Sequence, residues 1–340
     1  MKIYRDEDCS IDPIKGLKIA VIGYGSQGKA QSNMMKMSGL DVIIGVRKDG
    51  ASWNSAKEDG FEVYEISDAS KKADIIHILI PDEEQKKVYD NYIAPYLTKG
   101  KTLGFSHGFN ISFKRIFPPK DIDVIMIAPK SPGPSEFKAY LEGFGVPALV
   151  AVHQDSTGKA KEKALAMAKA MNFTKAGVID LNSLEGSRPD IMPFDKETFT
   201  DLFGEQSVLC GGISELIQTS FEVMVEAGYP PEMAYFEACH EIKLITDLIY
   251  EGGIEYMYSK VSNTAEYGGR TRGKRVINRN IVKPVLREML KDIESGKFAK
   301  EWMDEADRGM PNLKKMRIEE GNNLLQKVGD ELRRLFKKRI

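Results

Sequence analysis

The hydrophobic positions in the first half of the chain form short, nearly continuous apolar runs that alternate with longer segments of helical spacing. The segments between several runs, such as SQGKAQSNMMKMSGL and PDEEQKKVYDNYIAPYL, repeat apolar residues as an α-helix does. Strands that are apolar on both faces and alternate with helices are typical of a mostly parallel sheet covered on both sides. The predicted strands are LKIAVIG (17–23), DVIIGVR (41–47), FEVYE (61–65), DIIHILI (74–80), KTLGFSH (101–107), DVIMIAPK (123–130) and PALVAVHQ (147–154).

The second half of the chain has a different pattern. After VIDL (178–181) comes NSLEGSRPDIMPF, which contains Gly, Pro and Ser without periodicity and indicates a domain boundary. Beyond it, SVLCGGISELIQTSFEVMVEAG and PEMAYFEACHEIKLITDLIYEGG are helix candidates, and LLQKVGDELRRLFKKRI is an amphipathic pattern with a solvated, basic face. We predict a Rossmann-like α/β domain over residues 1–182, an all-α domain over residues 183–330 and a basic tail over residues 331–340.

Length, composition and charge narrow the class of protein. With 340 residues, 42% hydrophobic and 29% charged, the chain has the composition of a soluble globular protein of one large or two ordinary domains. The net charge of −1 gives no general reason to expect nucleic acid or an anionic membrane as partner. The start, MKIYRDEDCS, lacks the apolar run of a signal peptide, and no stretch approaches 18 consecutive apolar residues. We therefore expect a cytoplasmic protein.

The cysteines argue against a disulfide framework or a structural zinc site. Cys9, Cys210 and Cys239 are odd in number and lack CxxC spacing. Cys239 and His240 are neighbours, but on a helix their side chains would point about 100° apart, so joint binding of a metal is not expected.

A glycine-rich turn, Gly23-Tyr24-Gly25-Ser26-Gln27-Gly28, follows the first predicted strand and opens a helical pattern. The GxGxxG spacing alone is weak, because glycines also close ordinary turns, but this context lets the backbone approach a pyrophosphate at a helix N-terminus. The second strand ends in Arg47-Lys48, where a basic side chain favours the 2′-phosphate of NADP, and Ser52 can add a neutral donor. A solvated basic loop is the alternative. The sequence favours NADP.

Two further polar residues lie at the carboxyl ends of predicted strands, where ligands bind in open α/β sheets. They are His107 in SHG and Lys130 in APK. A lone histidine is more often structural, and a strand-end lysine more often extends into solvent. On their own, these two residues leave catalytic and structural roles open.

Two pairs of acidic residues occur at i, i+4 spacing beside apolar positions, and on helices each pair shares one face. The pairs are Asp201 with Glu205 and Glu237 with Glu241. Carboxylates without histidine or cysteine suit hard cations, Mg²⁺ above all. The spacing alone leaves both a metal site and two solvated helix faces open.

Together these residues resemble ketol-acid reductoisomerases of the short, class I type. The motifs occur in order over most of the chain, roughly residues 15 to 330. They are GYGSQG, LIPDE (79–83), SHGF, APK followed by PG, GVPALVAVHQD, DLFGEQ with VLCGG, CHE with KLI and DLIYEGG, and SNTAEYGG.

The resemblance implies a two-step reaction with NADPH and two Mg²⁺ ions per active site. An alkyl group of 2-acetolactate or 2-aceto-2-hydroxybutyrate migrates to the neighbouring carbon, and NADPH reduces the new ketone to a 2,3-dihydroxy acid on the route to valine, leucine and isoleucine. It also implies an interlocked, knotted helical domain that forms a homodimer, with larger assemblies of dimers open. There, the Glu237/Glu241 helix and Ser262 of one chain complete the partner's site.

Carried over by motif, the resemblance implies roles for individual residues. Asp201, Glu205, Glu237 and Glu241 would be metal ligands, with Asp201 the best candidate to bridge the ions. His107, Lys130 and Glu241 would be catalytic, and Ser262 would contact substrate. Cofactor contacts would come from Gly23, Tyr24, Gly25, Ser26, Gln27, Gly28, Arg47, Ser52, Asp82, Glu83, Glu84, Gln85 and Gly133.

Three segments depart from the family pattern. Pro134-Ser135-Glu136-Phe137 replaces the usual His-Thr-Val-Arg, which puts local cofactor contacts in doubt. Residues 182–193 are longer than the usual link, and the phosphate loop has Gly50 where a serine is common.

Two rival hypotheses are a metal-independent dehydrogenase of the 3-hydroxyacid type, which has the same two-domain layout, and a non-catalytic NADP-binding regulatory or scaffold protein. Dependence on Mg²⁺ would separate the first from a reductoisomerase, and NADPH oxidation with a keto acid would exclude the second.

Overall fold

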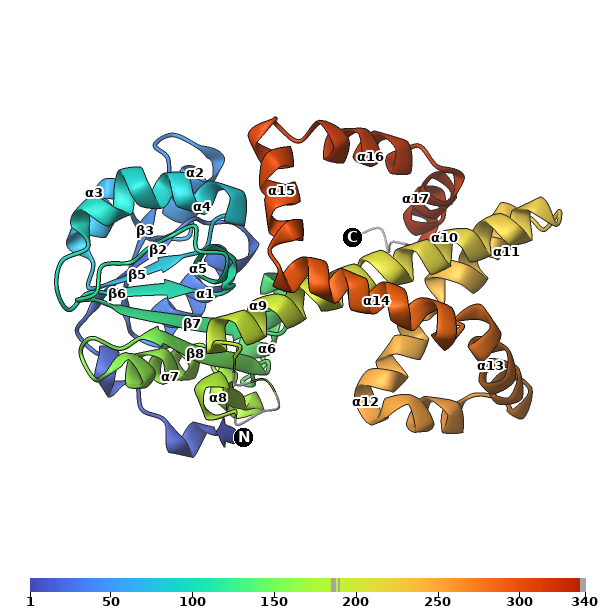
Figure 1. Cartoon of the computed structure of the whole chain (residues 1–340), viewed down its shortest axis with the longest axis horizontal. Helices are drawn as coiled ribbons and strands as arrows, with labels where there is room; N and C mark the ends of the chain where they lie inside the picture. The colour runs from blue at the N-terminus through green and yellow to red at the C-terminus, as the bar shows by residue number, and fades with distance from the viewer. Residues whose placement is uncertain (185–187, 189, 337–340) are drawn as a thin grey trace. The chain divides into compact units, whose positions relative to one another are not determined.

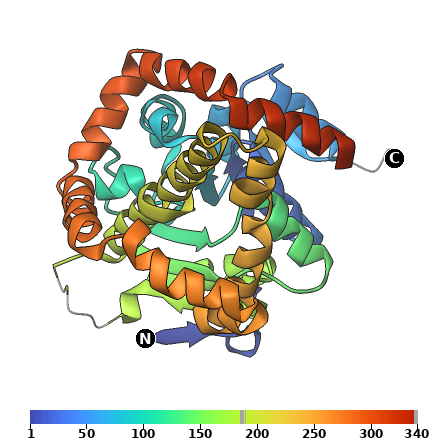
Figure 2. The ribbon, with the colours of Figure 1, turned by 90° about the vertical axis from the view of Figure 1, so that its right-hand side faces the viewer.

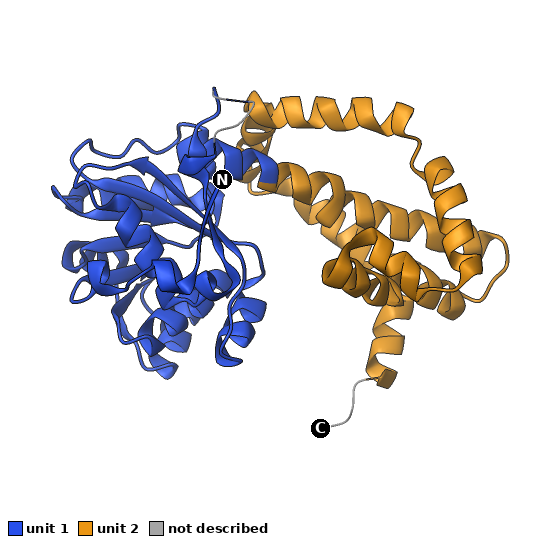
Figure 3. Cartoon of the chain, turned by 90° about the horizontal axis from the view of Figure 1, so that it is seen from below, with its two compact units in different colours: residues 1–200 blue, residues 201–340 orange. Residues whose placement is uncertain are grey.

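The chain forms two compact units, Met1–Thr200 and Asp201–Ile340, in a computed structural model that describes residues 1–184, 188 and 190–336 (Figure 3). The units divide inside helix α9 (Pro193–Gly204) rather than in the loop where the sequence analysis puts the boundary. Of the long link 182–193, residues 185–187 and 189 lie outside the described residues. The predicted tail begins inside the last described helix, α17 (Leu324–Phe336).

In the described residues, unit 1 contains a nine-stranded sheet of order β1-β9-β8-β7-β6-β5-β2-β3-β4. All neighbours pair in parallel except β7 with β8 and β1 with β9. The Rossmann-like prediction is confirmed, and β1 is an edge strand that the hydrophobic pattern did not predict. The strands are β1 (Lys2–Tyr4), β2 (Lys18–Ile22), β3 (Asp41–Gly45), β4 (Glu62–Tyr64), β5 (Ile75–Ile78), β6 (Thr102–Phe105), β7 (Asp123–Pro129), β8 (Ala148–Gln154) and β9 (Val178–Asp180).

Helices cover both faces of the sheet (Figure 1). Alternate residues of a strand point to opposite faces, so Ile19 and Val21 pack with α1 and α7, whereas Ala20 and Ile22 pack with α3. Burial on both faces explains why the strands read as continuous apolar runs. The helices of this unit are α1 (Ser26–Met37), α2 (Ala51–Glu58), α3 (Ile66–Lys72), α4 (Asp82–Val88), α5 (Phe109–Ser112), α6 (Gly133–Leu141), α7 (Ala160–Ala170) and α8 (Phe173–Ala176).

Unit 2 is helical, as predicted, and its helices follow one another around an open frame (Figure 2). One buried cluster joins α10, α11 and α17 through Phe221, Tyr235 and Leu332. Helix α12 bends at Gly253, whose φ of 84° interrupts the helix. The helices are α10 (Gly211–Glu226), α11 (Pro231–Tyr235), α12 (Ile242–Lys260), α13 (Asn263–Val276), α14 (Arg279–Glu294), α15 (Lys297–Asp307), α16 (Pro311–Gly321) and α17.

The continuous helical segment Pro193–Glu226 is long and apolar enough to cross a membrane, and 6% of its most apolar window is buried within the chain. Polar residues interrupt its apolar positions, so the sequence does not predict a membrane span here. Length and composition alone do not distinguish a membrane span from a helix that another protein surface covers.

Candidate active site

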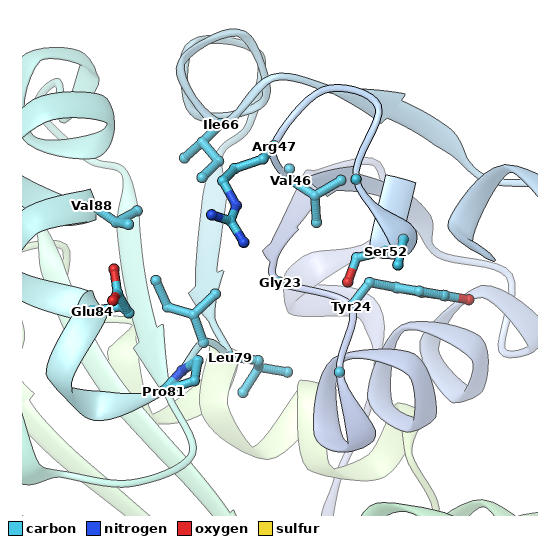
Figure 4. Close-up of a pocket in the computed structure, with 15 residues that line it drawn as sticks. Gly23, Tyr24, Val46, Arg47, Ser52, Ile66, Leu79, Pro81, Glu84 and Val88 are labelled. Carbon is cyan, nitrogen blue, oxygen red and sulfur yellow. The ribbon is translucent and has the colours of Figure 1, made fainter. Parts of the chain in front are cut away.

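A cavity of about 440 Å³ lies at the carboxyl ends of β2, β3 and β5 (Figure 4). Six of the residues predicted to contact a cofactor line it: Gly23, Tyr24, Gly25, Arg47, Ser52 and Glu84. Neighbouring strands end at this edge, so loops far apart in the sequence meet here. The other predicted cofactor residues, Ser26, Gln27, Gly28, Asp82, Glu83, Gln85 and Gly133, are not part of its lining.

The glycine-rich turn brings the start of α1 close to β2. Gly23 has a φ of 104°, and a Cβ there would lie 2.6 Å from the Leu79 carbonyl oxygen. A Cβ at Gly28 would lie 2.4 Å from the Gly23 carbonyl oxygen. A side chain at Gly28 would push the helix N-terminus away from the strand, and a side chain at Gly23 would push the turn away from the end of β5. A Cβ at Gly25 would meet nothing within 4 Å, so that side of the turn can admit a diphosphate at the N–H groups of α1.

Arg47 and Ser52 flank the cavity on the side of β3 and α2. Figure 4 shows the Arg47 side chain pointing into the cavity. The turn after it contains Asp49 in the left-handed conformation, with a φ of 57°, and Gly50 as the N-cap of α2. A planar fork of donors suits a phosphate, so the residues present fit a dinucleotide with a 2′-phosphate.

His107 and Asp82 meet at the ends of β6 and β5. The Nδ1 of His107 lies 2.9 Å from Oδ2 of Asp82. An ionised carboxylate only accepts hydrogen bonds, so Nδ1 carries the proton and the imidazole is held in one orientation. Gln85 Nε2 donates to the other Asp82 oxygen at 3.1 Å, and Asn110 donates to the Asp82 carbonyl at 2.9 Å. Asp82 and Gln85, predicted as cofactor contacts, therefore orient His107.

Lys130 follows β7, next to the strand that precedes His107. Its Nζ donates to Oε1 of Glu197 at 2.8 Å, and the Glu197 side chain is buried. Glu197 was missed by sequence reasoning. It lies four residues before Asp201, so one further step of the i, i+4 spacing would have found it. The i, i+4 spacing thus joins three acidic residues: Glu197 and Asp201 of α9, and Glu205, the first residue of the π-helical turn after it.

A second missed residue is Glu136 of α6, in the segment that departs from the family pattern. It is 1% exposed, and burial raises the pKa of its carboxyl to about 7, partly offset by a hydrogen bond from Gln27. The sequence does not show that this acid, among Pro, Ser and Phe, is buried, because the exposure of a side chain cannot be predicted from one position in the chain.

The four predicted metal ligands lie on helices interrupted by π-helical turns, Glu205–Leu209 and Phe236–His240. Such wide turns are frequent at functional sites. Asp201 is partly buried, and Glu205, Glu237 and Glu241 are exposed. Within the described part of one chain, no three His, Cys, Asp or Glu side chains gather as a metal site. The donor types suit Mg²⁺, but one chain does not bring them together.

Ser262, the predicted substrate contact, is the exposed N-cap of α13. Its Oγ accepts a hydrogen bond from the backbone N–H of Ala265 at 3.2 Å. The hydroxyl still has a hydrogen to donate. Capping explains a serine at this position without a substrate, so the structure is compatible with both roles.

The chain was compared with known proteins. Two family models match it, “Acetohydroxy acid isomeroreductase, NADPH-binding domain” over residues 13–177 and “Ketol-acid reductoisomerase, C-terminal domain” over residues 194–338. A ketol-acid reductoisomerase (NADP(+)) from Methanocaldococcus jannaschii is 56% identical over 98% of both chains. A ketol-acid reductoisomerase (NAD(+)) from an uncultured archaeon is 53% identical over 99% of both. The solved structure of an NADH-preferring ketol-acid reductoisomerase from an uncultured archaeon aligns with a TM-score of 0.93 and 53% identity, covering 99% of this chain and 100% of that one.

Proposed function

Because the chain belongs to the ketol-acid reductoisomerase family over almost its whole length, we propose that it converts 2-acetolactate or 2-aceto-2-hydroxybutyrate to the 2,3-dihydroxy acid in the cytoplasm, on the route to branched-chain amino acids. The matches to two family models and to full-length relatives do not favour the 3-hydroxyacid-type alternative or a non-catalytic protein. The observation that carries the proposal is the position of the dinucleotide cavity and of His107 and Lys130 at one edge of one sheet.

The dinucleotide would lie with its diphosphate at the glycine-rich turn and its 2′-phosphate at Arg47. When bound, NADPH supplies the hydride. His107, oriented by Asp82, can exchange a proton with a substrate oxygen through its second ring nitrogen. Lys130, held by Glu197, presents a positive charge near the oxygens whose charge changes during migration. Ser262 can donate a hydrogen bond to the substrate.

The magnesium ions would be held by Asp201, Glu205, Glu237 and Glu241. When bound, paired divalent ions lower the pKa of a hydroxyl and polarise a carbonyl. Since one chain does not gather these carboxylates, we propose that the site is completed by Glu237, Glu241 and Ser262 of a second chain in a homodimer. Larger assemblies of dimers stay open.

Exposed apolar residues of unit 2 support the dimer. Leu209, Leu216 and Val223 follow one another at intervals of seven residues and are 70%, 41% and 59% exposed. A stripe of this spacing is typical of a helix that packs against another helix. A second copy of the chain would cover it, which also accounts for the apolar segment Pro193–Glu226 without a membrane.

The test follows NADPH absorbance with 2-acetolactate, with and without Mg²⁺. We expect turnover only with Mg²⁺, and Asp201→Asn should abolish both steps because each depends on the paired charge. Asp121→Asn, the same change at an exposed position of unit 1, is the matched control and should keep activity. Turnover without divalent ions, or near-normal activity of Asp201→Asn at low millimolar Mg²⁺, would contradict the metal assignment.

A further inference from the structure

Glu136 lies at the contact between α6 and α1, the helix that begins at the glycine-rich turn. A Cβ at Gly133 would lie 2.3 Å from the Ser26 carbonyl oxygen, so the first residue of α6 packs directly on the first residue of α1. One turn further along α6, Glu136 Oε1 accepts a hydrogen bond from Gln27 Nε2 at 2.8 Å. The Glu136 carboxyl is thus one side chain away from the turn that would hold the diphosphate.

Gln27 is fixed by a chain of buried hydrogen bonds. Its Nε2 also donates to the Ser131 carbonyl at 3.2 Å, and its Oε1 accepts from Gln31 Nε2 at 2.8 Å. Gln31 in turn accepts at Oε1 from His77 Nε2, 2.9 Å away. Burial lowers the pKa of His77 to about 4, so its imidazole is neutral. At the other end of the chain, Gln27 Nε2 is the group that faces Glu136.

The second oxygen of Glu136, Oε2, is buried and has no hydrogen-bond partner among the described residues.

The charged neighbours on the surrounding elements are engaged elsewhere or exposed. Lys138 and Glu142 of α6 are exposed and 3.9 Å apart, Lys29 and Lys36 of α1 bind Asp59 and the Gly60 carbonyl, and Lys130 binds Glu197. Of the charged residues on α7, Glu162 is exposed, and the lysines Lys161, Lys163 and Lys169 pair with Asp180, Asp123 and Asp6. An ionised Glu136 would therefore be an uncompensated buried charge.

We propose that Glu136 is a proton-linked positioning residue for the dinucleotide, and that the cofactor binds to the form in which Glu136 carries its proton. This rests on the proposed function, because it requires a dinucleotide at the glycine-rich turn. The bound diphosphate brings negative charge towards α1 and excludes water, and both effects disfavour the carboxylate. When the dinucleotide binds above neutral pH, Glu136 takes up a proton from solvent. While Glu136 is protonated, Gln27 stays in place for the diphosphate. Because the pKa of Glu136 is about 7, this exchange takes place near neutral pH.

The test measures the dissociation constant of NADH by its fluorescence between about pH 6 and pH 8.5. NADH is the first probe because it lacks the 2′-phosphate, which itself titrates near pH 6; NADPH is measured in parallel. In wild type we expect the dissociation constant to rise with pH, about tenfold for each unit by which binding raises the Glu136 pKa. Glu136→Gln should bind as tightly at high pH as wild type does at low pH. Glu142→Gln, an exposed acid on the same helix, is the control and should follow the wild-type curve.

Calorimetry on wild type gives a second readout that needs no variant. NADH titrations near pH 7.5 in two buffers of different ionisation enthalpy should reveal uptake of a fraction of a proton per NADH bound. The same pH dependence in Glu136→Gln and wild type, or no proton uptake, would overturn the inference while dinucleotide binding stands. Failure of both dinucleotides to bind at any pH would overturn the proposed function with it.

Discussion

Arg47 points into the dinucleotide cavity, and the turn that follows it supplies an acid, Asp49, and a residue without a hydroxyl, Gly50. Charge-assisted hydrogen bonds from a guanidinium to a phosphate are worth about 1.5–3 kcal/mol each, whereas a missing neutral hydrogen bond costs about 0.5–1.5 kcal/mol. Arg47 therefore outweighs the two unfavourable neighbours. We expect a preference for NADPH with a narrow margin, although one of the two relatives above is described as NAD-dependent.

The ratio of kcat/KM for NADPH to that for NADH measures this margin. Arg47→Asp should reverse the preference towards NADH, and Lys48→Asp, which makes the same charge change outside the cavity lining, should leave it nearly unchanged. Gly50→Ser should widen it, because the Cβ position is 3.4 Å from its nearest neighbour and serine is a good N-cap for α2. A ratio unaffected by Arg47→Asp would mean that other residues recognise the 2′-position.

Glu136 also makes stability depend on pH. The folded chain keeps the proton up to about pH 7, whereas the unfolded carboxyl releases it near pH 4.5, so the unfolded state gains stability as pH rises between these values. Glu136→Gln should therefore exceed wild type by roughly 2–4 kcal/mol in unfolding free energy at pH 8, and the difference should vanish near pH 4.5. Urea unfolding at fixed protein concentration measures it. An equal difference at both pH values would show that ionisation is not the cause.

At the scale of elements, the contact between α6 and α1 depends on a residue without a side chain. Gly133→Ala would place a Cβ 2.3 Å from the Ser26 carbonyl oxygen, which forces α6 away from α1. We expect a loss of about 1–3 kcal/mol in stability and weaker dinucleotide binding, since Gln27 would lose its partner on α6. Ser135→Ala, at an exposed position of the same helix, is the control for both measurements. Unchanged NADPH affinity in Gly133→Ala would separate this contact from the cofactor.

At the scale of the whole molecule, the exposed stripe of Leu209, Leu216 and Val223 predicts that the chain is not stable as a monomer. Val223→Asp would bury a carboxylate without a partner in an apolar interface, which should weaken the dimer by about 100-fold or more. Light scattering after size exclusion measures the mass. Phe117→Asp, at a 73% exposed position of unit 1, is the control and should stay dimeric. A wild-type monomer at micromolar concentration would contradict the proposed assembly.

Sites built from two chains also predict complementation. Asp201→Asn and Glu241→Gln chains, each inactive alone, should regain about a quarter of wild-type activity when unfolded and refolded together in equal amounts. Half of the dimers would be mixed, and one of the two sites in each would carry no substitution. Confirmed mixed dimers without activity would indicate that each site is built from one chain.

The sequence by itself determined the strands of the sheet other than β1 and β9, the position of the glycine-rich turn and the family. These features depend on local patterns: strands buried on both faces require continuous apolar residues, and a close strand–helix turn requires glycine at Gly23. Arg47, His107 and Lys130 were predicted as site residues for the same reason, since a strand end can be recognised from one stretch of chain.

Only the tertiary structure decided the partners of these residues. Asp82 meets His107, and Glu197 meets Lys130, across 25 and 67 positions of sequence, and no local pattern joins them. The same holds for Glu136, whose burial against Gln27 comes from the packing of two helices that are distant in sequence. Burial sets whether a carboxyl keeps its proton, and burial is a property of the folded chain, because it depends on every element that excludes water from the group.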